Sequence, residues 1–195
     1  MTKTFEFLFD FGSPASYLAW ARLPALERRT GARARLRPIL LGAVFKATGN
    51  ASPAMIPAKG RWMMQDLAMW AARHGTPFRV NPHFPVNTMA LMRGAAALAD
   101  DEPRLRAWCE ACFAGMWRDG LNMADPDQAA AALAPAGFGA DELRAMSEDP
   151  AAKQRLRAET ESAVARGVFG APTFFVGERM FFGQDRMDFV EEALA

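Results

Sequence analysis

The sequence has 195 residues, 51% of them apolar and including fifteen Phe and five Trp, which is enough to bury a sizeable core in one compact domain. Its 23 basic and 22 acidic residues leave a formal net charge of +1, which argues against a disordered tail and against a nucleic-acid partner. No apolar run approaches about 18 residues and no charged segment leads into one at the N-terminus, so we expect a soluble, cytoplasmic protein with no membrane partner.

The first forty residues have the pattern of a strand, a helix and a second strand. Phe and Leu dominate residues 4–9, as in a short buried strand. Ser13 then provides a helix N-cap, Pro14 a first helical residue that needs no N–H donor, and Gly31 a helix end. Residues 32–39 alternate weakly between apolar and polar, which is typical of an edge strand.

A long helix-rich block follows. Gly and Pro interrupt residues 40–60, where we expect a loop or short helical turns. Residues 78–87 contain too much Pro to continue a helix. Stretches rich in Ala, Leu, Met and Arg predict helices at residues 61–74, 87–99, 103–119, 125–133 and 141–166.

Strands return near the C-terminal end. Residues 173–176 and 179–182 form a predicted hairpin around a tight turn at Gly177-Glu178. A last helix over residues 186–194 follows, with Asp185 as its expected N-cap. The predicted order is therefore β-α-β, a helical insertion, then β-β-α.

This order resembles the thioredoxin fold of the DsbA type, in which a Pro, here Pro172, directly precedes the third strand. The resemblance implies an α/β thioredoxin-like protein with a large α-helical insertion. We expect residues 1–42 and 165–195 to form a discontinuous thioredoxin-like domain and residues 43–164 to form the insertion domain.

In thioredoxin-like oxidoreductases the start of the first helix holds a C-x-x-C pair, whose first sulfur is activated by the helix N-terminus. Here the same position reads Ser13-Pro14-Ala15-Ser16, with oxygen in place of both sulfurs. Such a site cannot exchange disulfides, and no His lies nearby in the sequence to activate a hydroxyl nucleophile. Ser13 can instead donate a hydrogen bond to a thiolate on another molecule, and glutathione is the expected source.

Four separated motifs carry a closer resemblance. They are residues 10–14 with Tyr17-Leu18, Gly49-Asn50 through residues 57–60, residues 84–88, and residues 167–173 with 183–186. Over nearly the whole chain, these motifs resemble the 2-hydroxychromene-2-carboxylate isomerases, which are relatives of the kappa-class glutathione transferases. The motif at residues 84–88 is more typical of the isomerases than of the transferases.

The resemblance implies a glutathione site that begins at Ser13, whose hydroxyl faces the glutathione sulfur. Asn50 and Lys59 match family positions that contact glutathione. The chemistry agrees, because glutathione carries two carboxylates and one ammonium and needs partners for both charges. Taken singly, each residue has a simpler interpretation: Ser13 as a helix cap, Asn50 as a turn residue and Lys59 as a solvated charge.

The C-terminal motifs are expected to complete this site. By resemblance, Pro172 is cis and the Ala171 backbone pairs with the glutathionyl cysteine, while Gln184 and Asp185 bind the γ-glutamyl end. A cis-Pro leaves the N–H and C=O of the preceding residue free to pair like an edge strand. Singly, Pro172 fits an ordinary trans turn and Asp185 a helix cap, so the site depends on their joint occurrence.

The implied reaction interconverts 2-hydroxychromene-2-carboxylate and trans-o-hydroxybenzylidenepyruvate in the breakdown of naphthalene-type aromatic compounds. Glutathione acts as a cofactor, because its thiolate adds to an enone, permits rotation and is expelled again. For the small aromatic carboxylate substrate we expect contacts from Phe45, Trp62 and the loop at residues 84–88, with Asn87 of that loop as a hydrogen-bond donor. The resemblance also implies a homodimer.

Two other functions stay open at this point. A kappa-class-like glutathione transferase or peroxidase would share Ser13, Asn50, Lys59 and Asp185 but would consume glutathione. A non-catalytic thioredoxin-like binding module would account for the missing sulfurs, although it would not need the polar residues that suit glutathione.

A C-x-x-C pair does occur at Cys109 and Cys112, but inside a predicted helix. Helical spacing places both on one face among aromatic residues, which favours buried, inert thiols. A zinc site that adds His74 and His83 matches no standard spacing, so we expect no metal. The arginines between residues 28 and 37 are interpreted as a solvated surface.

Overall fold

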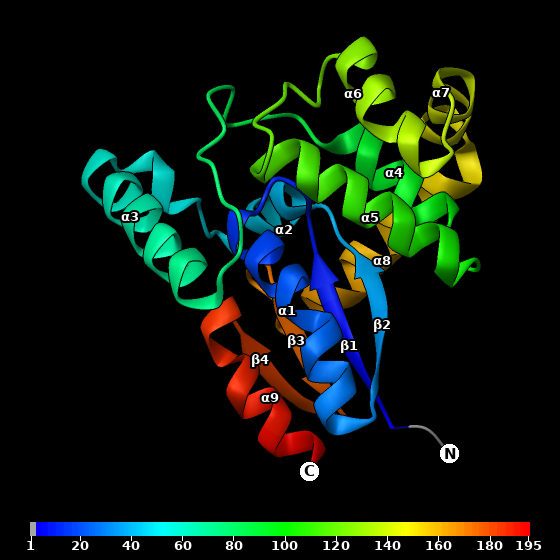
Figure 1. Cartoon of the computed structure of the whole chain (residues 1–195). Coiled ribbons are helices and arrows are strands. Elements are labelled where there is room, and N and C mark those ends of the chain that lie inside the picture. Colours follow the sequence, from blue (N-terminus) through cyan, green and yellow to red (C-terminus); the bar gives the residue numbers. More distant parts are fainter. Residues whose placement is uncertain (1–2) are drawn as a thin grey trace.

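The computed structural model describes residues 3–195, and its centre is one four-stranded sheet (Figure 1). The strands lie in the order β2-β1-β3-β4, with β1 parallel to β2 and antiparallel to β3, and β3 antiparallel to β4. Their bounds are β1 (Thr4–Phe9), β2 (Arg33–Pro38), β3 (Thr173–Val176) and β4 (Arg179–Phe182). The predicted strands and the predicted edge position of β2 are therefore confirmed.

Helices account for most of the remaining residues between 3 and 195. The α-helices are α1 (Pro14–Thr30), α2 (Leu41–Thr48), α3 (Pro57–His74), α4 (Met89–Ala97), α5 (Glu102–Trp117), α6 (Pro126–Leu133), α7 (Ala140–Glu148), α8 (Pro150–Ala165) and α9 (Met187–Leu194). Short 3₁₀ turns occur at η1 (Pro53–Met55), η2 (Ala134–Ala136) and η3 (Gln184–Arg186). The region at residues 40–60 thus contains the expected short helical elements.

Two predicted details of helix ends are wrong. The helix expected over residues 141–166 is two helices, because the Asp149 carboxylate caps α8 and Pro150 occupies its first position. An Asp before a Pro is itself a helix start, so the sequence carried this signal. Asp185 does not cap α9, which has Arg186 at its N-cap and no side-chain cap; Asp185 instead lies within η3.

The two faces of the sheet are covered by different helices (Figure 1). Phe5, Phe7 and Phe9 of β1 pack in the main core with α1, α5 and α9. Leu8, on the opposite face, packs in a smaller cluster with residues of α2 and α8, including Val44. This alternation follows from the two-residue repeat of a strand, and it leaves β1 buried on both sides.

Aromatic contacts join the insertion to the sheet just before the start of α1. The Phe11 and Phe113 rings lie 4.9 Å apart in an edge-to-face arrangement, and the Trp117 indole N–H donates to the Phe11 carbonyl at 2.8 Å. The core is therefore shared by α5 and the strand-to-helix junction. The predicted division into a thioredoxin-like domain and an insertion domain stays a prediction.

The C-x-x-C pair lies in α5, as predicted, with both Cys109 and Cys112 fully buried and free. Burial raises the pKa of both thiols well above the usual range, which disfavours thiolate chemistry there. Within residues 3–195, no three potential metal-ligating side chains gather in one place. None of the helices in that range combines the length and apolar composition needed to cross a membrane.

The contact between α4 and α5 depends on a glycine. A Cβ added to Gly94 would lie 2.2 Å from Trp108 Cζ2, so we expect Gly94→Ala to lower the free energy of unfolding by about 1–3 kcal/mol through overpacking. Gly42→Ala is the matched control, because an added Cβ in α2 meets nothing within 4 Å. That control should raise stability by up to about 1 kcal/mol through helix propensity. Denaturant unfolding measures both, and equal effects would contradict this packing.

Candidate active site

A cavity of about 380 Å³ opens at the N-terminal end of α1. Four chain segments contribute to its wall, at residues 12–15, 50–53, 169–171 and 182–185. Side chains from α2, α3 and the following loop complete it: Leu41, Phe45, Met63, Asp66, Leu67 and Phe84. The cavity therefore lies between the start of the first helix, the segment before β3, the end of β4 and the helical insertion.

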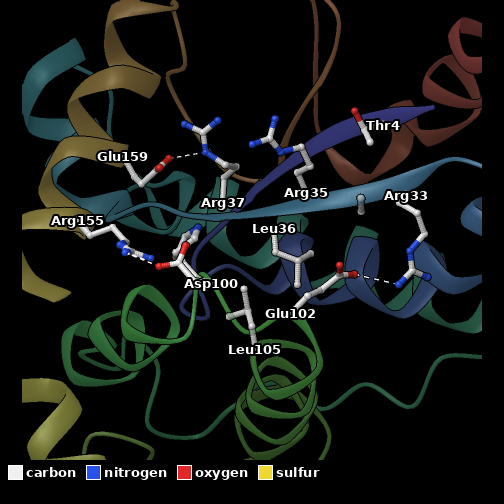
Figure 2. Close-up of a pocket in the computed structure, with 13 residues that line it drawn as sticks. Thr4, Arg33, Arg35, Leu36, Arg37, Asp100, Glu102, Leu105, Arg155 and Glu159 are labelled. Carbon is white, nitrogen blue, oxygen red and sulfur yellow. Dashed lines mark hydrogen bonds and ion pairs between the residues drawn. The ribbon is translucent and has the colours of Figure 1, made fainter. Parts of the chain in front are cut away.

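A larger hollow of about 660 Å³ lies along β2, but most of its charged side chains are already paired with one another, Arg35 being the exception (Figure 2). The ion pairs are Arg33–Glu102 at 3.0 Å, Arg155–Asp100 at 2.7 Å, and Arg37–Glu159. This is the composition of a solvated surface, which agrees with the interpretation of the arginines at residues 28–37. The smaller cavity, with its polar groups at a helix start, is the better candidate for chemistry.

Ser13, in the wall of this cavity, joins the start of α1 to the segment that precedes β3. It is buried and caps α1, since its Oγ accepts a hydrogen bond from the Ser16 N–H at 3.1 Å. The same hydroxyl donates to the Ala171 carbonyl oxygen at 2.9 Å. The peptide bond between Ala171 and Pro172 is cis, as predicted. A ligand anion at this point would face the positive end of α1 and a hydroxyl that can turn toward it.

Three residues before Ser13 the chain carries a buried carboxylate, that of Asp10. It accepts hydrogen bonds from the Gly12 N–H at 2.8 Å, the Leu41 N–H at 2.8 Å and the Thr88 hydroxyl at 2.7 Å. Burial raises the pKa of Asp10, and these three hydrogen bonds oppose that rise. The sequence motif includes Asp10, but its contacts with α2 and with Thr88 follow only from the tertiary structure.

Two acidic side chains, Asp66 and Asp185, belong to the cavity wall. The pKa of Asp66 is raised, first because the carboxyl is partly removed from water and then because the Asp185 carboxylate is nearby. Asp185 also pairs with Arg186 at 2.6 Å. The Gln184 Oε1 atom is buried and accepts no hydrogen bond within residues 3–195. These oxygens suit a ligand cation with several N–H donors, such as an ammonium.

Aromatic side chains form the apolar part of the wall. Phe45, which we expected in an aromatic pocket, lines the cavity. Phe84 also lines it and belongs to the motif at residues 84–88. Phe169 and Phe182 face each other with ring centroids 4.5 Å apart. Sequence reasoning missed this pair, because the two residues belong to a loop and a strand with no shared pattern. A second cis peptide bond, Phe84-Pro85, was also not predicted.

The structure brings most of the predicted site residues together, but not all of them. Ser13, Phe45, Asn50, Ala171, Gln184 and Asp185 line the cavity, and Pro172 adjoins it through Ala171. The Asn50 side chain donates to the Phe169 carbonyl at 2.8 Å. The ligand contacts assigned to these residues stay predictions.

Three predicted residues do not line the cavity: Lys59, Trp62 and Asn87. Lys59 and Trp62 are exposed on α3, and Trp62 retains 56% of its accessible surface. The Asn87 Oδ1 atom accepts a hydrogen bond from the Met89 N–H at 3.0 Å, at the start of α4. Asp66 of α3 was missed, because an acidic residue in a predicted helix has the pattern of a surface charge.

Comparison with known proteins agrees with this architecture. The family model of the DSBA-like thioredoxin domain matches residues 4–195. A 2-hydroxychromene-2-carboxylate isomerase of Sphingobium xenophagum is 37% identical over 198 residues, which cover 100% of this chain and 99% of that protein. A human glutathione S-transferase kappa 1 is 28% identical, over 100% of this chain and 92% of that protein.

A solved structure of a 2-hydroxychromene-2-carboxylate isomerase superposes with a TM-score of 0.89 and 30% identity, covering 98% of this chain and 94% of that one. The predicted DsbA-type thioredoxin fold is thereby confirmed. Identity of 37% over the full length of both chains, together with this superposition, shows that the chain belongs to the 2-hydroxychromene-2-carboxylate isomerase family of DSBA-like thioredoxin proteins.

Proposed function

We propose that this chain is a glutathione-dependent isomerase that interconverts 2-hydroxychromene-2-carboxylate and trans-o-hydroxybenzylidenepyruvate. The observation that carries the proposal is the hydrogen bond between Ser13 and Ala171, at the position where thioredoxin-like enzymes hold a reactive sulfur. No cysteine lines this cavity within the described residues 3–195. The chain therefore offers a place for a thiol and needs a ligand to provide it.

The cavity suits glutathione at both of its ends. A thiolate beside Ser13 would receive a hydrogen bond from the hydroxyl and lie at the N-terminus of α1, which lowers the pKa of a thiol. The ammonium of the γ-glutamyl group would face Asp66 and Asp185, and its N–H donors would satisfy the buried Gln184 Oε1.

The chain's own residues would hold and orient the reacting groups. Ser13 would release its bond to the Ala171 carbonyl and donate to the thiolate, while its Oγ keeps the N–H of Ser16. Phe45, Phe84 and the other apolar side chains would bind the aromatic ring and exclude water from it. Bound glutathione supplies a nucleophile that adds reversibly to the enone, so that the former double bond can rotate.

The proposal also includes a small aromatic carboxylate as the substrate, a cytoplasmic location and a homodimer. Several apolar side chains of α3 and the segment before it are exposed, which supports a protein contact there; they include Met55, Ile56, Trp62 and Met69. A kappa-type glutathione transferase is the second candidate, favoured by the full-length similarity to the human kappa 1 transferase.

The direct test is turnover of 2-hydroxychromene-2-carboxylate with and without glutathione. We expect conversion to require glutathione and to leave its concentration unchanged after many turnovers, because addition and expulsion of the thiolate cancel. Product chromatography together with a thiol assay measures both. A stable glutathione conjugate would instead support the transferase, and turnover without glutathione would exclude the assigned role of the thiol.

Ser13→Ala should separate catalysis from helix capping. We expect kcat/KM to fall roughly 100-fold, as when a donor to a reacting anion is removed. Stability should fall by only about 1 kcal/mol, the value of an N-cap. The matched control is Asp149→Ala, which removes the cap of α8 away from the cavity and should leave kcat/KM unchanged. Parallel losses of stability and kcat/KM in both variants would contradict the proposed role of Ser13.

Asp185→Asn should weaken glutathione binding about tenfold, because a charge-assisted hydrogen bond to the ammonium is lost. A glutathione analogue without the α-amino group should bind the variant and the unaltered chain equally. Asp100→Asn is the control, since Asp100 pairs with Arg155 and does not line the cavity. Calorimetric titration measures each affinity, and an equal loss with the analogue would place the ammonium elsewhere.

A further inference from the structure

Asp10 has no assigned part in the proposed reaction, although its backbone carbonyl accepts a hydrogen bond from the N–H of Ser13 at 3.0 Å. Its carboxylate is 3% exposed and accepts three hydrogen bonds. The donors come from three separate segments: Gly12 before α1, Leu41 at the start of α2, and Thr88 at the start of α4. A single buried group therefore connects two residues of the cavity wall, Gly12 and Leu41, with the end of the loop that carries Phe84.

The hydrogen-bond pattern requires a carboxylate. Oδ1 accepts from both the Gly12 N–H and the Thr88 hydroxyl, and Oδ2 accepts from the Leu41 N–H. An amide in this place would direct its own N–H at one of the two backbone donors, which would then be buried without an acceptor. Asp10 and Thr88 also lie beside Gly12, where an added Cβ would make ordinary van der Waals contact with Asp10 Oδ1 at 3.4 Å and Thr88 Cγ2 at 3.5 Å.

The bond between Thr88 and Asp10 joins the loop that contributes Phe84 to the cavity wall with the segment that precedes Ser13. The loop at residues 81–88 carries Phe84, which lines the cavity. At its first end, the Asn81 amide donates to the carbonyls of Met116 and Leu121, both at 2.8 Å, and so fixes the loop to the end of α5 and the segment after it. At its other end, the Thr88 hydroxyl donates to Asp10, next to the thiol position.

We propose that Asp10 is a positioning residue, and that its hydrogen bond with Thr88 holds the loop at residues 81–88 in register with the thiol position at Ser13. The inference rests on the proposed function, because Phe84 is taken to contact the aromatic substrate and Ser13 the glutathione sulfur. In this inference, the bond between Thr88 and Asp10 aligns the substrate. The bonds from Gly12 and Leu41 to Asp10 hold the part of the wall that would bind glutathione.

Thr88→Val and Thr88→Ser form the deciding pair, since valine keeps the shape of threonine and serine keeps its hydroxyl. We expect Thr88→Val to lower kcat/KM for 2-hydroxychromene-2-carboxylate by about 10- to 100-fold, as misplacement of a substrate by about 1 Å does. Its Kd for glutathione, measured by calorimetry, should change less than about twofold, because Gly12 and Leu41 still bind Asp10. Thr88→Ser should restore kcat/KM to within about threefold of the unaltered chain.

Thr30→Val, at the far end of α1, is the control for loss of a threonine hydroxyl and should leave both constants unchanged. Asp10→Asn should impair glutathione binding and turnover together. If Asp10→Asn does not fold, the comparison of Thr88→Val with Thr88→Ser still tests the inference.

Unchanged kcat/KM in Thr88→Val, or equal impairment in Thr88→Ser, would overturn the inference. A loss of glutathione affinity in Thr88→Val that matches its loss of kcat/KM would do so too. Absence of glutathione-dependent turnover in the unaltered chain would instead contradict the proposed function.

Discussion

The cavity depends on one hydrogen bond, from the Ser13 hydroxyl to the Ala171 carbonyl oxygen, between residues 158 positions apart in the chain. Antiparallel pairing of β1 with β3 makes it possible, because Leu8 lies opposite Thr173 in the sheet. The chain leaving β1 and the chain entering β3 must therefore meet at one edge. The hydrogen bond between Ser13 and Ala171 follows from this meeting, whereas the cap of α1 by Ser13 is a local contact with the Ser16 N–H.

The helical insertion supplies the rest of the site rather than a separate one. Helices α2 and α3 contribute Phe45 and Asp66 to the wall, and the loop before α4 contributes Phe84. Asp10 anchors the start of α2 and the end of this loop to the strand-to-helix junction, and the aromatic contact between Phe11 and Phe113 anchors α5 there. Thiol position and substrate wall are thus built on a common core.

The electrostatics of the cavity are one-sided. Asp66 and Asp185 are part of the wall, whereas none of its lining residues between 3 and 195 is Lys or Arg. An ammonium is therefore matched by side chains, while a ligand carboxylate or thiolate would be met by the Ser13 hydroxyl, backbone N–H groups and the positive end of α1. Such an arrangement favours a ligand that carries both signs of charge, as glutathione does.

The sequence by itself determined the strands, most of the helices and the identity of Ser13 as the replaced sulfur position, because caps, turns and strand patterns act between near neighbours. Its motifs also indicated the family and the cis bond before Pro172. The contacts of Asp10 with Leu41 and Thr88, the place of Asp66 in the cavity wall and the pairing of Phe169 with Phe182 were decided only by the tertiary structure. Each of these depends on contacts between segments far apart in the chain, for which local sequence carries no signal.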